Sequence, residues 1–170
     1  MPRSVTRSRP AAAHKASALA PARQLAGFIA KFDPAVAKLT RAALQVLRAR
    51  FPTAVTLVYD NYAALAIGFG PNERASEAII SLAVYARGVN LYFIQGAILP
   101  DPLGLLQGSG SQGRYIRLHH AAQIRDPGVE TLLRAAEREG DTPLPPKGRG
   151  YTVIKSISAK QRPRRASSHV

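Results

Sequence analysis

Residues 54–69 decide the fold, and they read AVTLVYDNYAALAIGF. Apolar residues occupy alternate positions in both halves of this stretch, around Leu57 and around Ile67, which is the period of a strand with one buried face. Asp60 and Asn61 lie between the halves, and both residue types tolerate a left-handed backbone. The stretch therefore predicts two strands joined by a tight hairpin turn.

Further strands are predicted on the C-terminal side of this hairpin. Residues 79–86 and 89–93 form two runs separated by Arg87-Gly88, and residues 114–120 form another. A parallel crossover needs about a dozen residues or more, so the short links between the four strands up to residue 93 require antiparallel neighbours. A short helical turn is predicted at residues 100–106, where Pro100 begins a segment rich in leucine.

Helical periodicity flanks the strands. Apolar residues recur at spacings of three and four in residues 25–32, 34–51 and 127–139. Asp33-Pro34 and Asp126-Pro127 each combine an N-cap residue with proline in the first turn, which marks a helix start. The predicted fold is α+β: a two-layer, five-stranded, mostly antiparallel sheet packed by helices on one face, in the order α-α-β-β-β-β-short α-β-α.

The 170 residues divide into one domain and two extensions. Residues 1–20 predict a basic flexible N-terminal arm, residues 21–140 the α+β domain, and residues 141–170 a basic, proline-containing, disordered C-terminal tail. One alternative stays open within the tail: the apolar residues 151–154 dock on the sheet as an extra edge strand.

Positive charge is concentrated toward the two ends of the chain. The net charge of +14 divides into +9 for residues 1–50, −1 for residues 51–140 and +6 for residues 141–170. This asymmetry favours contact with nucleic acid or another polyanion, although solvated tails without a partner have the same composition. The candidate contact residues are Arg3, Arg7, Arg9, Lys147, Arg149, Lys160, Arg162, Arg164 and Arg165.

Several kinds of chemistry are excluded or unsupported. The chain contains no cysteine, which excludes disulfides, thiolate metal sites and a cysteine nucleophile. His119 and His120 are adjacent on a predicted strand, so we expect one to pack and the other to face solvent rather than both to bind one metal. No catalytic constellation is visible, and we expect no enzyme activity, no metal site and no cofactor.

A glycine-rich loop at residues 108–113 is the best candidate for binding a small anion. Successive backbone N–H groups in such a loop form a concave donor site, which nearby arginines would reinforce. The alternative is a mobile connection rich in turn residues. The candidate anion-binding residues are Gly108, Ser109, Gly110, Ser111, Arg114 and Arg117.

Four segments together resemble the YdhG-like domain family, a group of small bacterial domains mostly of unknown function. The segments are residues 91–93, 106–110, 114–118 and 126–129. The resemblance implies a two-layer α+β domain over residues 20–140. One family member is described as a frataxin-like iron chaperone, but no matching set of iron ligands is found in this chain.

The sequence thus predicts a non-enzymatic binding module whose basic tails contact nucleic acid or another polyanion. The alternative is an iron chaperone or small-anion carrier, by resemblance to the family. No run of 18 apolar residues is present, so we expect no membrane span and a cytoplasmic location. The sequence makes no prediction about oligomeric state.

Overall fold

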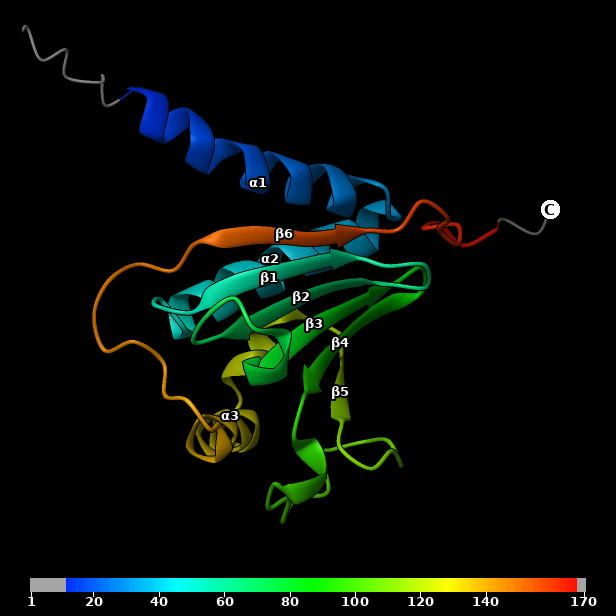
Figure 1. Ribbon diagram of the computed structural model, residues 1–170. Coiled ribbons are helices and arrows are strands. Elements are labelled where there is room, and N and C mark those ends of the chain that lie inside the picture. The colour runs from blue at the N-terminus through cyan, green and yellow to red at the C-terminus, as the bar shows by residue number, and fades with distance from the viewer. Residues whose placement is uncertain (1–11, 168–170) are drawn as a thin grey trace, which may run out of the picture.

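The computed structural model describes residues 12–167, and the side chains of residues 20–167. Its centre is a six-stranded sheet with the order β5-β4-β3-β2-β1-β6 (Figure 1). Every neighbouring pair is antiparallel except β1 and β6, which are parallel, so the sheet is mixed. The strands are β1 (Val55–Asp60), β2 (Leu65–Gly70), β3 (Ile80–Tyr85), β4 (Gly88–Phe93), β5 (Arg114–Leu118) and β6 (Thr152–Ile157).

Three α-helices accompany the sheet: α1 (Ala12–Ala30), α2 (Pro34–Arg50) and α3 (Pro127–Glu139). Proline occupies the first turn of both α2 and α3, as the sequence predicts. Asp33 and Asp126 stand at the two N-cap positions, but neither side chain makes a capping hydrogen bond. Three short 3-10 helices lie in the connections: η1 (Ala75–Glu77), η2 (Gly96–Ile98) and η3 (Ala121–Arg125).

The core lies on one face of the sheet. Val58, Ile67, Leu82, Leu91 and Ile116 are paired in register across five strands, so their side chains share that face, and all five are buried. They form one cluster with apolar residues of all three helices. Burial of this continuous apolar surface is the main stabilising contribution to the two-layer fold.

The predicted α+β class and the four antiparallel neighbours are confirmed, but the expected number of five strands is wrong. The additional strand is β6, at residues 152–157, so the expected disordered tail is wrong here and the alternative of an extra edge strand in this segment is confirmed. It pairs with the otherwise open edge of β1, where Ile154 packs against the core. An unpaired β1 would leave backbone N–H and C=O groups exposed at an edge, and β6 covers them.

Two local expectations are also wrong. Residues 101–106 form no helix: only Pro102 and Leu103 lie in a turn, and the Asp101 carboxylate accepts hydrogen bonds from the backbone N–H groups of Leu105 and Leu106. Two short-range bonds to one side chain replace the helical bonds there. Helix α1 begins at Ala12, within the range expected to be an N-terminal arm, whereas residues 1–11 lie outside the described residues.

None of the helices in the described range combines the length and the hydropathy that a membrane crossing requires.

Candidate functional site

The C-terminal end of β1 holds a buried carboxylate. Asp60 is fully buried and receives two cations from distant segments. Lys31 Nζ lies 2.9 Å from Asp60 Oδ2, and Arg164 Nη2 lies 2.8 Å from Asp60 Oδ1. Burial raises the pKa of Asp60, but hydrogen bonds from Gln161 and Lys31 and the charges of Lys31 and Arg164 outweigh it, so the pKa lies below its ordinary value. The sequence predicts only a turn at Asp60, because no local feature distinguishes a buried aspartate from an exposed one there.

Arg164 anchors the C-terminal segment to this carboxylate. Its exposed fraction is only 6%, and its guanidinium carbon lies 5.4 Å from the ring centroid of Phe32. It also donates to the backbone carbonyl of Asn61, whereas its Nε and Nη1 atoms have no hydrogen-bond partner among the described residues. The expected disordered tail is therefore wrong for this part of the chain, and Arg164 is not accessible to a polyanion.

The basic residues on either side of Arg164 stay exposed. Arg162 lies over the ring of Tyr62, 5.4 Å from its centroid, and Arg165 Nε donates to the backbone carbonyl of Lys31 at 3.4 Å. Lys160 is exposed as well. The C-terminal segment that Arg164 anchors therefore lies beside the end of α1. Its exposed basic residues increase the positive charge near the helices.

Helix α2 carries a stripe of exposed basic residues. Lys38, Arg41 and Arg48 recur with Gln45 at spacings of three and four, which places them on one helix face, and all are exposed. Neither α1 nor α2 contains an Asp or Glu residue. Among residues 20–167, no carboxylate lies within ion-pair distance of this stripe. The helical spacing of these residues is visible in the sequence, but it does not show that the stripe lacks ion-pair partners.

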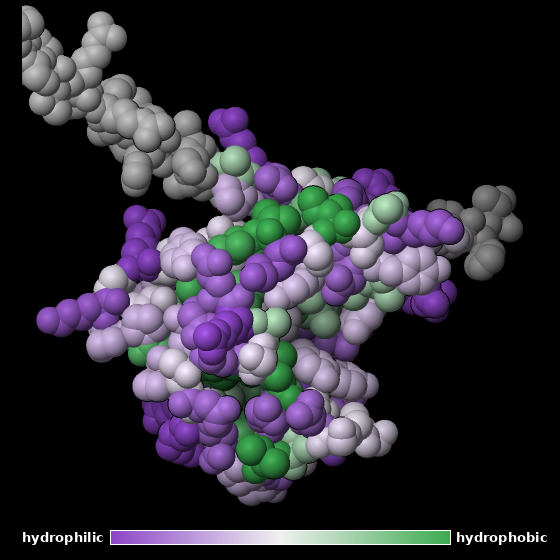
Figure 2. All heavy atoms as spheres, in the orientation of Figure 1, coloured by the Kyte–Doolittle hydropathy of each residue, from purple (hydrophilic) through white to green (hydrophobic). Residues whose placement is uncertain are grey.

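Contacts between α1, α2 and β6 place the two basic ends of the chain on the same side of the fold. Helix α1 packs against β6 and against α2, and Arg48 Nη2 donates to Thr152 Oγ1 of β6 at 3.2 Å. Figure 2 shows hydrophilic side chains spread over this upper side, around a strip of hydrophobic atoms. We use the name basic face for the exposed lysines and arginines that α2, β6 and the segment after β6 contribute: Lys38, Arg41, Arg48, Lys155, Lys160, Arg162 and Arg165.

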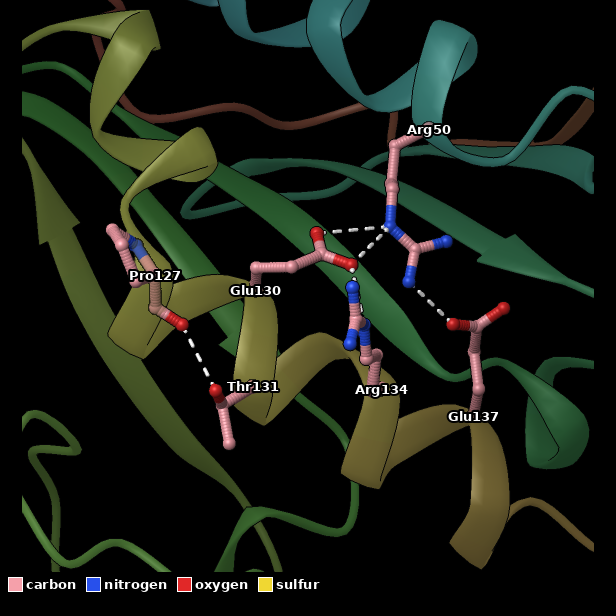
Figure 3. A network of polar contacts seen from close by, with 6 residues as sticks. All are labelled: Arg50, Pro127, Glu130, Thr131, Arg134 and Glu137. Atoms are coloured by element: carbon pink, nitrogen blue, oxygen red, sulfur yellow. Dashed lines mark hydrogen bonds and ion pairs between the residues drawn. The ribbon is translucent and has the colours of Figure 1, made fainter.

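Carboxylates gather on the α3 side, where they are paired. Arg50 at the end of α2 donates from Nε to Glu130 at 3.0 Å and from Nη2 to Glu137 at 2.6 Å (Figure 3). Arg134 donates to Glu130 at 3.2 Å. Burial raises the pKa of Glu130, but the hydrogen bonds and charges of Arg50 and Arg134 lower it further, to a net value below the ordinary one. A carboxylate held ionised in this way is poorly suited to donate a proton.

The predicted anion-binding residues do not converge. Arg114 and Arg117 are three positions apart on β5, so their side chains lie on opposite faces of the sheet. Arg114 Nη1 donates to the carbonyls of Gly110 and Gly113, and Arg117 donates to the carbonyl of Arg87 and to Asn90 Oδ1. Gly108, Ser109, Gly110 and Ser111 are exposed. Anion binding by this loop stays a prediction, but Arg117 cannot contribute from the other face.

The remaining predicted residues are separate from the basic face or outside the described range. Lys147 and Arg149 are exposed in the connection between α3 and β6. Arg3, Arg7 and Arg9 lie outside the described residues. Both His119 and His120 are exposed, because β5 ends at Leu118, so the expectation that one of them packs is wrong.

The part of the chain that the structure describes has no group of three or more His, Asp or Glu side chains arranged to hold a metal ion. The iron-chaperone alternative stays a prediction.

Comparison with known proteins adds no assignment: no family model matches the chain, no curated protein is detectably similar to it, and no solved structure matches its fold. The resemblance to the YdhG-like domain family accordingly stays a prediction.

Proposed function

We propose that this protein is a non-enzymatic module that binds nucleic acid through the basic face. The observation that carries the proposal is the separation of charge in the fold. None of the ion pairs among the described residues includes Lys38, Arg41 or Arg48, and α2 itself contains no Asp or Glu residue. Unpaired lysines and arginines on one surface attract a phosphate backbone and release its counterions.

This proposal moves the contact from the tails, where we expected it, to a folded surface. Lys160, Arg162 and Arg165 remain in it, while Arg164 leaves it because the Asp60 ion pair buries its side chain. A surface fixed by an ordered strand and helix loses less conformational entropy on binding than a free tail does. The cytoplasmic location and the YdhG-like membership are part of the same proposal.

The proposal predicts strongly salt-dependent binding. Fluorescence anisotropy of the full chain with a labelled 20-nucleotide DNA of mixed sequence, measured from 50 to 300 mM salt, gives the affinity and its salt slope. The variant Lys38→Gln/Lys155→Gln/Lys160→Gln removes three charges from the basic face. We expect its salt slope to be smaller by about three, because each lost phosphate contact removes about one from the slope.

A matched control removes the same charge elsewhere. Arg87→Gln/Arg125→Gln/Arg138→Gln changes three exposed arginines that have no ion-pair partner among the described residues and lie outside the basic face. We expect this control to retain the affinity and the salt slope of the natural chain. Equal losses in the two triple variants would show that net charge alone drives binding and would refute the basic face.

A further inference from the structure

A groove of about 310 Å³ lies between α1 and α2. Its apolar lining includes Leu25 and Ile29 of α1 and Leu44 of α2, all buried, and the small side chain of Ala26 leaves room above them. Arg41 and Arg48 stand on the α2 side of the groove. The groove therefore combines an apolar floor with two cations on one wall.

Arg48 is the unusual member of this lining. Burial lowers its pKa from the ordinary arginine value. Its only hydrogen-bond partner among the described residues is a neutral one, Thr152 Oγ1 at 3.2 Å, and neither α1 nor α2 supplies a carboxylate. Arg48 is exposed beside the groove and has no counter-ion among the described residues, so an anion bound there would gain a charge-assisted hydrogen bond.

The chemistry of the groove selects its occupant. A volume near 300 Å³ is at the lower end of the range for small-molecule sites. Residues 1–11 carry Arg3, Arg7 and Arg9, and a second copy of the chain carries a net charge of +14, so both repel the arginines of the groove. The remaining fit is a small molecule with one apolar chain and one anionic head.

We propose that the α1–α2 groove binds a long-chain carboxylate, a free fatty acid. Its alkyl chain lies on Leu25, Ile29 and Leu44, and its carboxylate accepts hydrogen bonds from Arg48 and Arg41. The site goes beyond nucleic-acid binding, although the two arginines belong to both surfaces. Charge-assisted hydrogen bonds from two guanidinium groups orient the head, and burial of the chain contributes most of the affinity.

Isothermal titration of the full chain with dodecanoate, below its micelle concentration, tests the site. We expect saturable binding with one ligand per chain. Dodecyltrimethylammonium has the same chain and the opposite charge, and butyrate has the same head and a short chain. Both should bind at least about tenfold more weakly, which corresponds to about 1.4 kcal/mol. Equal binding of dodecyltrimethylammonium would mean nonspecific detergent uptake and would overturn the proposal.

Two variants locate the site. Ala26→Phe fills the groove from an exposed helix position and should weaken dodecanoate binding at least about tenfold, while Ala20→Phe, also exposed on α1 but outside the groove, should not change it. Arg48→Gln should weaken dodecanoate about tenfold and leave any residual binding of dodecyltrimethylammonium unchanged. Arg138→Gln on α3 controls for net charge.

Amide chemical shifts of the natural chain give a measurement that needs no variant. Dodecanoate should shift residues 22–29 and 41–48 and leave α3 unchanged, and shifts elsewhere would refute the site. Ala26→Phe removes no charge, so it should retain DNA affinity in the anisotropy experiment. Failure of dodecanoate binding therefore leaves the nucleic-acid proposal intact, and failure of DNA binding leaves this one intact.

Discussion

Arginines on two sides of helix α2 have opposite surroundings. Arg50, at its C-terminal end, meets two carboxylates of α3 and is mostly covered. Arg41 and Arg48, on the side toward α1, meet no carboxylate among the described residues. The residue type is the same, so the neighbours that tertiary structure supplies determine the role: the first arginine links two helices, and the others are available to an anion.

The C-terminal segment repeats this contrast within two consecutive residues. Arg164 is buried in an ion pair with Asp60, while Arg165 stays exposed. A run of basic residues in a sequence is therefore not one functional unit. Each residue contributes to stability or to binding according to its burial and its partners.

The largest expected effect follows from this second contrast. Arg164→Ala leaves Asp60 buried with Lys31 as its only remaining cation, and we expect the free energy of unfolding to fall by about 3–5 kcal/mol. Arg165→Ala, one position further on, should change it by about 0.5 kcal/mol or less, because that side chain is exposed. Urea denaturation at neutral pH measures both, and similar losses would contradict the anchoring role of Arg164.

The next largest expected effect is on DNA affinity, and it differs between arginines on the two sides of α2. Arg41→Gln/Arg48→Gln should lower DNA affinity on the order of tenfold and reduce the salt slope by about two. Arg50→Gln/Arg134→Gln removes the same charge from the α3 side, where the arginines are already paired, and should leave the slope unchanged. Anisotropy with the 20-nucleotide DNA distinguishes them, and a smaller slope in the second variant would remove the distinction between the two sides.

Acid provides a graded test of the paired groups. The pKa values of Asp60 and Glu130 lie below their ordinary values in the folded protein, so the unfolded chain binds more protons at low pH. Their contribution to stability is complete at neutral pH and is lost as the pH falls through the unfolded value of about 4 toward the folded values. Denaturation between pH 7 and pH 3 should show this loss, and Asp60→Asn should show a shallower pH dependence over that window. An unchanged slope would mean that Asp60 titrates alike in both states.

The smallest expected effect lies in the α3 network. Arg50→Gln breaks two ion pairs whose members are each about a quarter to a third exposed, and we expect a cost of about 1 kcal/mol or less. That corresponds to a fall in melting temperature of about 2–4 °C for a chain of this size. Arg134→Gln, with its more exposed side chain, should cost less still. A loss comparable with that of Arg164→Ala would place this network among the main anchors of the fold.

Local pattern alone determined most of the elements in this protein. Alternation around Leu57 and Ile67 predicted β1 and β2, and the Asp-Pro pairs predicted the first residues of α2 and α3. These features are readable because hydrophobic period and proline geometry act within a few residues. The hypothesis of a binding module with basic extensions also came from the sequence, through the distribution of charge.

Only the tertiary structure decided which distant residues meet. Arg164 and Asp60 are 104 positions apart, and no periodicity links an arginine in a proline-broken tail to an aspartate beside a hairpin. The parallel pairing of β6 with β1 is equally nonlocal. Whether a charged side chain is buried, and which partner it meets, depends on the assembled core. A charged side chain needs a partner only when packing has removed the water around it.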